Sequence, residues 1–395
     1  MTLTLLLDLD DTLLDTNLEA FVPAYFQALS AHLAEQTVPN ETVRALLGGL
    51  YLMSESEDPT RTLEEVFEMD FYPQLGVSKQ ALIHILDEFY DRVFPMLAGH
   101  TRQRLEAVQL IEWAISCGYR IAIATDPLFP RKATHHRLRW AGLDPEHFEL
   151  ISSFEHFHFS KTHPAYYAEV LGRLGWPEGP VLMVGNDISR DLIPAHRLGL
   201  KTFFIDGETA SSPGFEAGRG KLADLRPWLE SIDVATLEPS FKSRDALIAI
   251  LISTPAVLRS LLAPLSEEQW RHEPTREDWA MNEIVCHLRD TEREIHQMQL
   301  SLLIEKEGAF IPRPDTGVWA SEREYLNIDG KAALTDFALA RIETVKTLKA
   351  LDEQIWSRSA RHAIFGPTDF LEAISFMTDH DRLHIQQAWQ TLKSV

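Results

Sequence analysis

The sequence predicts two folds in one chain: a doubly wound α/β domain with a parallel sheet at about residues 1–232, and an all-α four-helix bundle at about residues 243–395. In the first part, apolar runs of strand length alternate with helical segments, which is typical of a parallel sheet covered by helices on both faces. Past residue 240 the strand patterns stop and long helical segments take over. A chain of 395 residues is also too long for one compact domain.

The first predicted strand is the apolar run Leu3–Leu7, which ends in the carboxylates Asp8 and Asp10 and then in Thr12. Side chains two positions apart on a strand point to the same side, so both carboxylates would enter one pocket. Two carboxylates held close together repel each other unless a cation lies between them. This spacing therefore indicates a Mg²⁺ site, because Mg²⁺ prefers oxygen ligands.

The segment between Asp15 and about Leu110 has apolar residues three and four positions apart. This spacing places apolar side chains on one face of a helix, so we expect several helices here. The stretches that carry the pattern are residues 21–29, 41–47 and 79–90.

Further apolar runs also end in polar residues. The run 121–124 precedes Thr125, the run from 151 precedes Lys161 after a short mixed stretch, and the run 181–184 breaks at Gly185 into Asn186, Asp187 and Asp191. Residues 201–206 predict the last strand, 207–220 a glycine- and serine-rich loop, and 222–229 a closing helix. The linker to the second part is expected at about residues 233–242.

The four polar motifs, in this order, resemble the haloacid dehalogenase (HAD) superfamily of aspartate-nucleophile phosphohydrolases over about residues 1–232. The resemblance implies that Asp8 is the nucleophile and Asp10 the general acid and base. Thr125 and Lys161 would stabilise the transferring phosphoryl group. The helical insertion at about 16–110 would be the cap that closes over the site.

In the same resemblance, Mg²⁺ is held by Asp8, the backbone carbonyl of Asp10, and Asn186, Asp187 or both, while Thr12 and Asp191 support these groups. The sequence departs from the family pattern at two points. Asn186 follows Gly185 where many relatives have aspartate, and Thr162 follows Lys161 where many have proline. Because dehalogenases of the superfamily lack the aspartate found here at position 10, a phosphatase is favoured.

The second part contains four predicted helices, at about residues 243–264, 280–305, 331–352 and 368–392, which predict a four-helix bundle. His380 and His384 are four positions apart and lie on the apolar side of the last helix, and the second helix carries His287. Such a pair is often solvent-facing or caps a core. Three imidazoles pointing into a bundle are also suited to a divalent transition metal, Zn²⁺, Ni²⁺ or Fe²⁺.

The runs around His287 and around His380–His384 together resemble the DinB/YfiT-like metal-binding bundles over about residues 243–395. That family takes one histidine from its second helix and two, four positions apart, from its last, so the resemblance implies a three-histidine metal site. Asp290 and Asp381 are expected to orient the imidazoles as hydrogen-bond acceptors.

Composition excludes several classes of partner. The formal net charge of −22 argues against binding to nucleic acid or to an anionic membrane. Cys117 and Cys286 are the two cysteines, so no disulfide framework is expected and a cytoplasmic location fits. We expect no signal peptide, since the apolar start lacks a basic region, and no membrane-spanning segment.

The sequence therefore predicts a Mg²⁺-dependent phosphohydrolase that acts on a small phosphorylated metabolite through an aspartyl-phosphate, with a metal-binding bundle attached. Two alternatives concern the bundle. It carries the main activity, as a thiol-dependent transferase or a metal-dependent hydrolase, or it is a non-catalytic module through which a homodimer forms.

Overall fold

The computed structural model describes residues 2–205, 214–275 and 278–393. The chain divides into two compact units. The first contains residues 1–166 and 178–239, and the second contains residues 167–177 and 240–395. A short segment before the expected linker thus groups with the second unit, which a boundary drawn along the sequence does not anticipate.

The first unit is built on a parallel sheet, which in the described residues has six strands in the order β5-β4-β1-β6-β7-β8. The strands are β1 (Thr4–Leu7), β4 (Arg120–Ile123), β5 (Leu150–Ile151), β6 (Val181–Gly185), β7 (Lys201–Ile205) and β8 (Gly218–Gly220). β1 lies between β4 and β6, with Leu5 paired to Ile121 and to Leu182. Because β1, β4 and β6 are parallel neighbours, the residues that follow them meet at one edge of the sheet.

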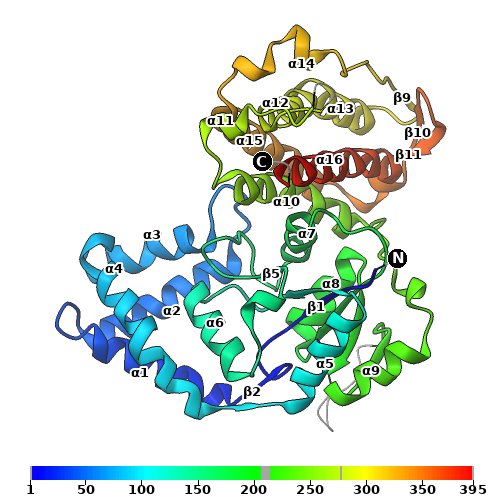
Figure 1. Ribbon diagram of the computed structural model, residues 1–395. Coiled ribbons are helices and arrows are strands. Elements are labelled where there is room, and N and C mark those ends of the chain that lie inside the picture. The colour runs from blue at the N-terminus through cyan, green and yellow to red at the C-terminus, as the bar shows by residue number, and fades with distance from the viewer. Residues whose placement is uncertain (1, 206–213, 276–277, 394–395) are drawn as a thin grey trace. The chain divides into compact units, whose positions relative to one another are not determined.

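Helices flank this sheet, as Figure 1 shows. They are α5 (Leu105–Ser116), α6 (Arg131–Trp140), α8 (Ile193–Leu198) and α9 (Leu222–Ser231), with the shorter elements η3 (Pro145–His147), η4 (Ile188–Leu192) and η5 (Val234–Leu237). Most of α7 (Pro164–Arg173) groups with the second unit. The strand residues Leu5 and Leu7 are fully buried and share a core with Leu110 of α5 and Leu225 of α9. Burial on both faces explains why these strands are almost wholly apolar. The predicted α/β class is confirmed.

The expected helical insertion forms a subdomain with its own core. It contains α1 (Leu18–His32), α2 (Pro39–Glu55), α3 (Leu63–Leu75), α4 (Lys79–Glu88), η1 (Phe89–Val93) and η2 (Phe94–His100), and the antiparallel strands β2 (Leu14–Thr16) and β3 (Thr101–Gln103) connect it to the sheet. Its core is aromatic, with Phe21, Phe71, Phe89 and Phe94 buried. The insertion therefore ends near residue 100, since the next helix packs on the sheet instead.

The glycine-rich segment after β7 contains a strand that the sequence pattern did not predict. Of the expected loop at 207–220, residues 206–213 lie outside the described part of the chain, and Gly218–Gly220 forms β8 beside β7. A Cβ at position 218 would collide with Trp228. Glycine is needed for close packing here, and this is why the strand carries no apolar pattern.

The second unit contains the four predicted helices, which confirms the expected bundle (Figure 1). They are α10 (Arg244–Leu262), α12 (Met281–Thr291) continued by η6 (Glu292–His296) and α13 (Gln297–Glu305), α15 (Gly330–Lys349) and α16 (Phe370–Leu392). Among the described residues, α10 is the one helix long and apolar enough to cross a membrane, but 72% of its apolar window is buried inside the protein. Burial in the core of the second unit therefore explains why α10 is so apolar.

The expectation that strands stop after residue 240 was wrong. The described part of the second unit also contains a small sheet of β9 (Ala309–Ile311), β10 (Ser359–His362) and β11 (Gly366–Asp369), in the order β11-β10-β9. Short connecting helices complete the unit: α11 (Glu267–Trp270), α14 (Trp319–Glu322), η7 (Tyr325–Asn327) and η8 (Glu353–Ser357). These strands have three or four residues and are defined by pairing between distant segments, which local periodicity does not reveal.

Candidate active site and histidine cluster

Lys161 lies between two buried carboxylates at the carboxyl edge of the sheet. Its ammonium Nζ is 2.7 Å from Asp8 Oδ1 and also contacts Asp191 Oδ1. All three side chains are almost completely buried. Asp8 follows β1 and Asp191 lies in the turn after β6, so the neighbouring strands bring together groups that are far apart in the sequence.

Asp191 contacts the candidate catalytic groups more closely than the sequence suggested. Burial, together with the nearby Asp8 carboxylate, raises the pKa of Asp191 to about 7, in spite of the opposing effect of Lys161. Its Oδ2 accepts a hydrogen bond of 2.9 Å from the backbone N–H of Asp187. A Cβ at position 185 would collide with this carboxylate, so Gly185 is required for its approach.

Asp10 is held by two side chains that sequence reasoning did not identify. Thr16 Oγ1 donates to Asp10 Oδ1 at 2.9 Å, and Arg137 Nη1 donates to Asp10 Oδ2. Arg137 is 1% exposed and lies on α6, and its guanidinium carbon is 4.5 Å from the centre of the Phe129 ring. A fully buried arginine must be paired, but a lone arginine in a basic segment carries no motif by which it could be found.

Asn186 and Asp187 have different surroundings. Thr12 Oγ1 donates to Asn186 Oδ1 at 3.1 Å, which ties the turn after β6 to the turn after β1. Asp187 Oδ1 instead accepts hydrogen bonds from the backbone N–H groups of Ser189 and Arg190 and from the Ser189 hydroxyl. Burial opposes ionisation of Asp187, but these bonds outweigh it and lower the pKa of the carboxyl. Asp187 thus caps the helical turn that follows, a role that aspartate commonly has at this position.

Thr125 and its neighbour Asp126 follow β4 at the same edge. Thr125 is buried, and its backbone carbonyl accepts hydrogen bonds from the hydroxyls of Ser152 and Tyr166, which fix this turn. Asp126 was not anticipated. Its Oδ1 accepts from the backbone N–H of Lys161 at 3.2 Å, and its Oδ2 is 3.3 Å from Arg190. Burial raises the pKa of Asp126.

In the second unit, one group of potential metal ligands is found among the described residues. Single side-chain nitrogens of His287, His380 and His384 lie within 4.8 Å of one another. The Nε2 atoms of His287 and His380 are 3.1 Å apart, and Gln387 Oε1 is 2.9 Å from His384 Nδ1. Burial, together with the other histidines, lowers the pKa of His287 to about 2 and that of His384 to about 3. The imidazoles are therefore neutral at pH 7, with lone pairs available for a metal.

The two acidic residues expected to orient these imidazoles differ. Asp381 has an oxygen 4.0 Å from His380 Nδ1, but its main partner is the buried Arg341. Asp290 instead accepts hydrogen bonds from Arg289, Arg323 and Tyr325. Among the described residues, no hydrogen bond joins Asp290 to a ligand histidine, although its charge acts on His287.

Arg341 also contacts Glu292, so that one guanidinium pairs with two carboxylates in the bundle interior. All three side chains are fully buried. Burial opposes ionisation of Glu292, but Arg341 and His296 outweigh it and lower the pKa to about 2. The same guanidinium holds the pKa of Asp381 well below its usual range despite burial.

Comparison with known families agrees with both halves of this description. Residues 2–199 match the haloacid dehalogenase-like hydrolase family, and residues 250–388 match the DinB superfamily. The first match covers half of the chain, and the protein therefore belongs to the haloacid dehalogenase-like hydrolases, as an enzyme of the HAD phosphatase/hydrolase type. Both resemblances seen in the sequence are confirmed. A search of curated proteins found no match.

Solved structures resemble each part separately. The HAD phosphatase of Thermococcus onnurineus is 18% identical, covers 58% of this chain and 98% of its own, and has a TM-score of 0.40. YfnB of Bacillus subtilis, a HAD-hydrolase solved with magnesium, is 23% identical over 58% of this chain and 99% of its own, with a TM-score of 0.39. YfiT of Bacillus subtilis, which has an unusual four-helix bundle topology, is 18% identical over 40% of this chain and 89% of its own, with a TM-score of 0.36.

Proposed function

We propose that the first unit is a Mg²⁺-dependent phosphatase that hydrolyses a small phosphate monoester through an aspartyl-phosphate. The observation that carries this proposal is the position of Lys161, whose ammonium bridges Asp8 and Asp191, with the acidic residue Asp10 two positions after Asp8. A carboxylate nucleophile, a separate carboxyl group for proton transfer and a fixed positive charge are the groups that this reaction needs.

In the proposed mechanism, an oxygen of Asp8 attacks phosphorus while the bond from phosphorus to the ester oxygen breaks. Asp10, in its protonated form, gives its proton to the leaving oxygen, and the alcohol departs. Asp10 then accepts a proton from water as the water oxygen attacks the aspartyl-phosphate. This breaks the bond from Asp8 to phosphorus and releases inorganic phosphate. Lys161 stabilises the negative charge of the transferring group in both steps.

The residues around Asp8 fit a magnesium ion. We assign its ligands to the Asp8 carboxylate, the backbone carbonyl of Asp10 and the amide oxygen of Asn186, all of them hard oxygen donors. Asp187 is left out because its Oδ1 already accepts three hydrogen bonds in the following turn. When bound, Mg²⁺ would neutralise charge on the phosphoryl oxygens. Burial and the nearby Asp8 carboxylate raise the pKa of Asp191, and a bound cation would offset the second of these effects.

The bundle supports a second proposed site. The three clustered imidazoles, neutral because of their burial, favour a borderline metal such as Zn²⁺, Ni²⁺ or Fe²⁺ over Mg²⁺. A catalytic role for this site, as a thiol-dependent transferase or a metal-dependent hydrolase, and a role of the bundle in homodimer formation both stay predictions. A cytoplasmic location also stays a proposal, supported by the free thiols of Cys117 and Cys286.

The experiment that tests the phosphatase uses the full chain and a panel of phosphate monoesters, with Mg²⁺ or with EDTA. Hydrolysis is expected with Mg²⁺ only, and Asp8→Asn should reduce it by at least about a thousandfold, because the amide has the same shape but cannot form the acyl-phosphate. Asp15→Asn, which changes an exposed carboxylate on β2, is the matched control and should retain activity. Phosphatase activity that survives in folded Asp8→Asn would disprove the assignment.

A further inference from the structure

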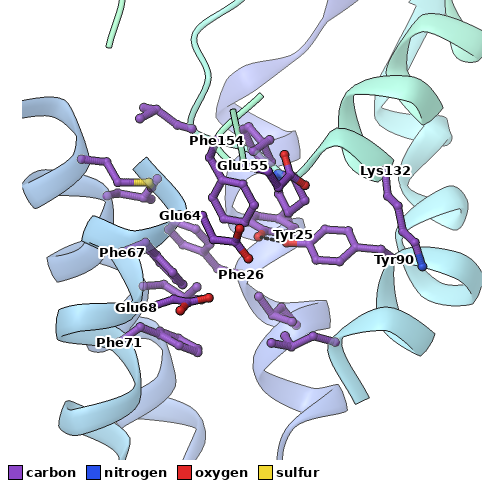
Figure 2. A pocket seen from close by; sticks show the side chains of 18 of the residues that line it. Tyr25, Phe26, Glu64, Phe67, Glu68, Phe71, Tyr90, Lys132, Phe154 and Glu155 are labelled. Carbon is purple, nitrogen blue, oxygen red and sulfur yellow. Dashed lines mark hydrogen bonds between the residues drawn. The ribbon is translucent and has the colours of Figure 1, made fainter. Parts of the chain in front are cut away.

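The helical subdomain contains a cavity of about 600 Å³ that lies within the first unit. Figure 2 shows Phe67 and Phe71 of α3 on one side of it and Tyr90 on the other. The wall also includes Leu128 and Phe129, which follow the Thr125 turn, and Arg190, which follows the Asn186 turn. Loops from the carboxyl edge of the sheet therefore close this cavity on one side.

Two contacts connect the cavity wall to the candidate active site. Phe129 lines the cavity, and its ring stacks on Arg137, which binds Asp10. Arg190 also lines it and is 3.3 Å from Asp126, whose other oxygen accepts from the backbone N–H of Lys161. The cavity is thus separated by one layer of residues from the groups proposed to act on the phosphoryl group. The organic part of a bound substrate would lie at this distance from them, inside the cavity.

The lining is mainly aromatic and aliphatic. Tyr25 and Tyr90 add polarity without charge, since their hydroxyl oxygens are hydrogen-bonded to each other at 2.9 Å. Burial raises the pKa of Tyr25 to about 12, so this pair stays neutral. A volume of this size suits a drug-sized organic group and exceeds what a triose or hexose phosphate would fill.

The charged groups of the wall have a negative excess. The described lining residues include four carboxylates, on Glu64, Glu68, Asp87 and Glu155, against the three cations of Lys79, Lys132 and Arg190. Each cation is already paired: Lys79 contacts both Glu64 and Glu68, Lys132 contacts Asp87 and also Asp91, and Arg190 contacts Asp126. Glu155 accepts hydrogen bonds from the backbone N–H of Arg131. A second anion on the substrate would therefore meet net repulsion.

We propose that this cavity binds the alcohol part of the substrate, and that the substrate is a phosphate monoester of a large, aromatic alcohol with no second anionic group. A positively charged substituent is favoured over a neutral one, because the carboxylate excess attracts it. This inference rests on the proposed phosphatase activity of the same unit, and it goes further by assigning the substrate class.

The test compares two esters with the same primary alkoxide leaving group, propyl phosphate and 3-(2-naphthyl)propyl phosphate, on the full chain with Mg²⁺. Equal leaving groups make the ratio of their kcat/KM values a measure of binding to the organic part. We expect the naphthyl ester to be preferred by at least about tenfold. If no ester of the earlier panel is hydrolysed, the proposed phosphatase fails. If the panel is hydrolysed but these two esters are not, or if both react at similar rates, the phosphatase stands and the substrate class is wrong.

A matched pair of substitutions tests whether the cavity causes the preference for the naphthyl ester. Ile83 lines the cavity from α4 and is 40% exposed, whereas Ile115 on α5 lies outside the cavity lining and is 43% exposed. Ile83→Trp fills space in the cavity and should reduce the naphthyl preference by at least about tenfold, while Ile115→Trp should leave it unchanged. An unchanged ratio in Ile83→Trp overturns the proposal.

In the wild type, 3-(2-naphthyl)propan-1-ol should inhibit hydrolysis of propyl phosphate competitively. Absence of inhibition would also overturn the proposal.

Charge selectivity is tested with naphthylpropyl phosphates that carry an aminomethyl or a carboxyl group on the ring. The wild type should prefer the aminomethyl ester, and Glu64→Gln should reduce this preference several-fold. Glu88→Gln removes a carboxylate from α4 that pairs with Arg92 outside the cavity lining, and it should not change the preference. A wild-type preference for the carboxyl ester would contradict the proposed role of the acidic groups.

Discussion

Arg137 donates a hydrogen bond to Asp10 across 127 positions of sequence, while Thr16 holds the other oxygen of the same carboxylate. The contact fixes the orientation of the residue proposed to transfer protons.

Replacing Arg137 should therefore reduce turnover more than substrate affinity. In Arg137→Met, Asp10 loses one of two positioning partners, and we expect kcat to fall by about 10- to 100-fold, most for esters with poor leaving groups. Arg137→Lys should restore part of the loss. The matched control is Arg139→Met on the same helix, since Arg139 is exposed. Steady-state kinetics on alkyl phosphates checks this, and a change confined to KM would refute the positioning role.

Asp191 and Asp187 should affect the pH dependence of stability with opposite signs. The folded-state pKa of Asp191 is about 7, above its unfolded value, so its contribution to stability is lost as pH rises from about 4 towards 7. The pKa of Asp187 is lowered, so its contribution is present above about pH 4 and lost below it.

Thermal unfolding in EDTA, followed from about pH 2 to pH 8, measures both effects. Relative to Asp191→Asn, the wild type should lose stability as pH rises from about 4 to about 7. Relative to Asp187→Asn, it should lose stability as pH falls below about 4, and the difference should be constant at higher pH. Parallel curves for the wild type and Asp191→Asn would contradict the raised pKa.

The bundle should bind one transition-metal ion through His287, His380 and His384. Purified full-length protein, incubated with excess Zn²⁺ and desalted, is expected to retain about one equivalent by elemental analysis. His380→Ala or His384→Ala should abolish this retention. His296→Ala is the informative control, because His296 lies beside His380 but hydrogen-bonds Glu292 instead. Loss of zinc only in His296→Ala would assign the site to a different set of ligands.

Much of the fold follows from local sequence patterns. β1, β6 and the helices of the bundle were predictable because apolar runs and three- to four-residue spacing are properties of contiguous residues. His380 and His384 were found in the same way, since four positions on a helix bring side chains together. The small sheet of β9, β10 and β11 was missed because its strands are short and depend on distant partners.

The parts of the site that escaped prediction depend on tertiary contacts. Arg137 becomes a partner of Asp10 only because α6, which follows β4, packs against β2 just after Asp10, and a lone arginine in the sequence cannot reveal this. The capping role of Asp187 had a weak local signal, because aspartate is a preferred residue at the start of a helix. The burial of Asp191 had no such signal. The grouping of residues 167–177 with the second unit had no signal in composition.

Arg341 should be the most sensitive position in the bundle. Arg341→Met leaves Glu292 and Asp381 buried without their cation, which we expect to cost about 3–5 kcal/mol of unfolding free energy. In the wild type the folded-state pKa of Glu292 is about 2, below its unfolded value, so its contribution to stability is complete above about pH 4.5 and lost as pH falls towards 2. Without Arg341, burial would raise this pKa, and the variant should become less stable as pH rises above 4.5.

Hydrogen exchange of α15 in the full chain at pH 5 and pH 8 measures this effect within the bundle. Lys346→Met changes an exposed cation on the same helix and should alter protection little at either pH. Protection in Arg341→Met should be lower than in the wild type at both values, and lower at pH 8 than at pH 5 once intrinsic exchange rates are accounted for. If Arg341→Met matches Lys346→Met, the buried ion pairs contribute little to stability, and the network would have to be explained by orientation of His380 through Asp381 instead.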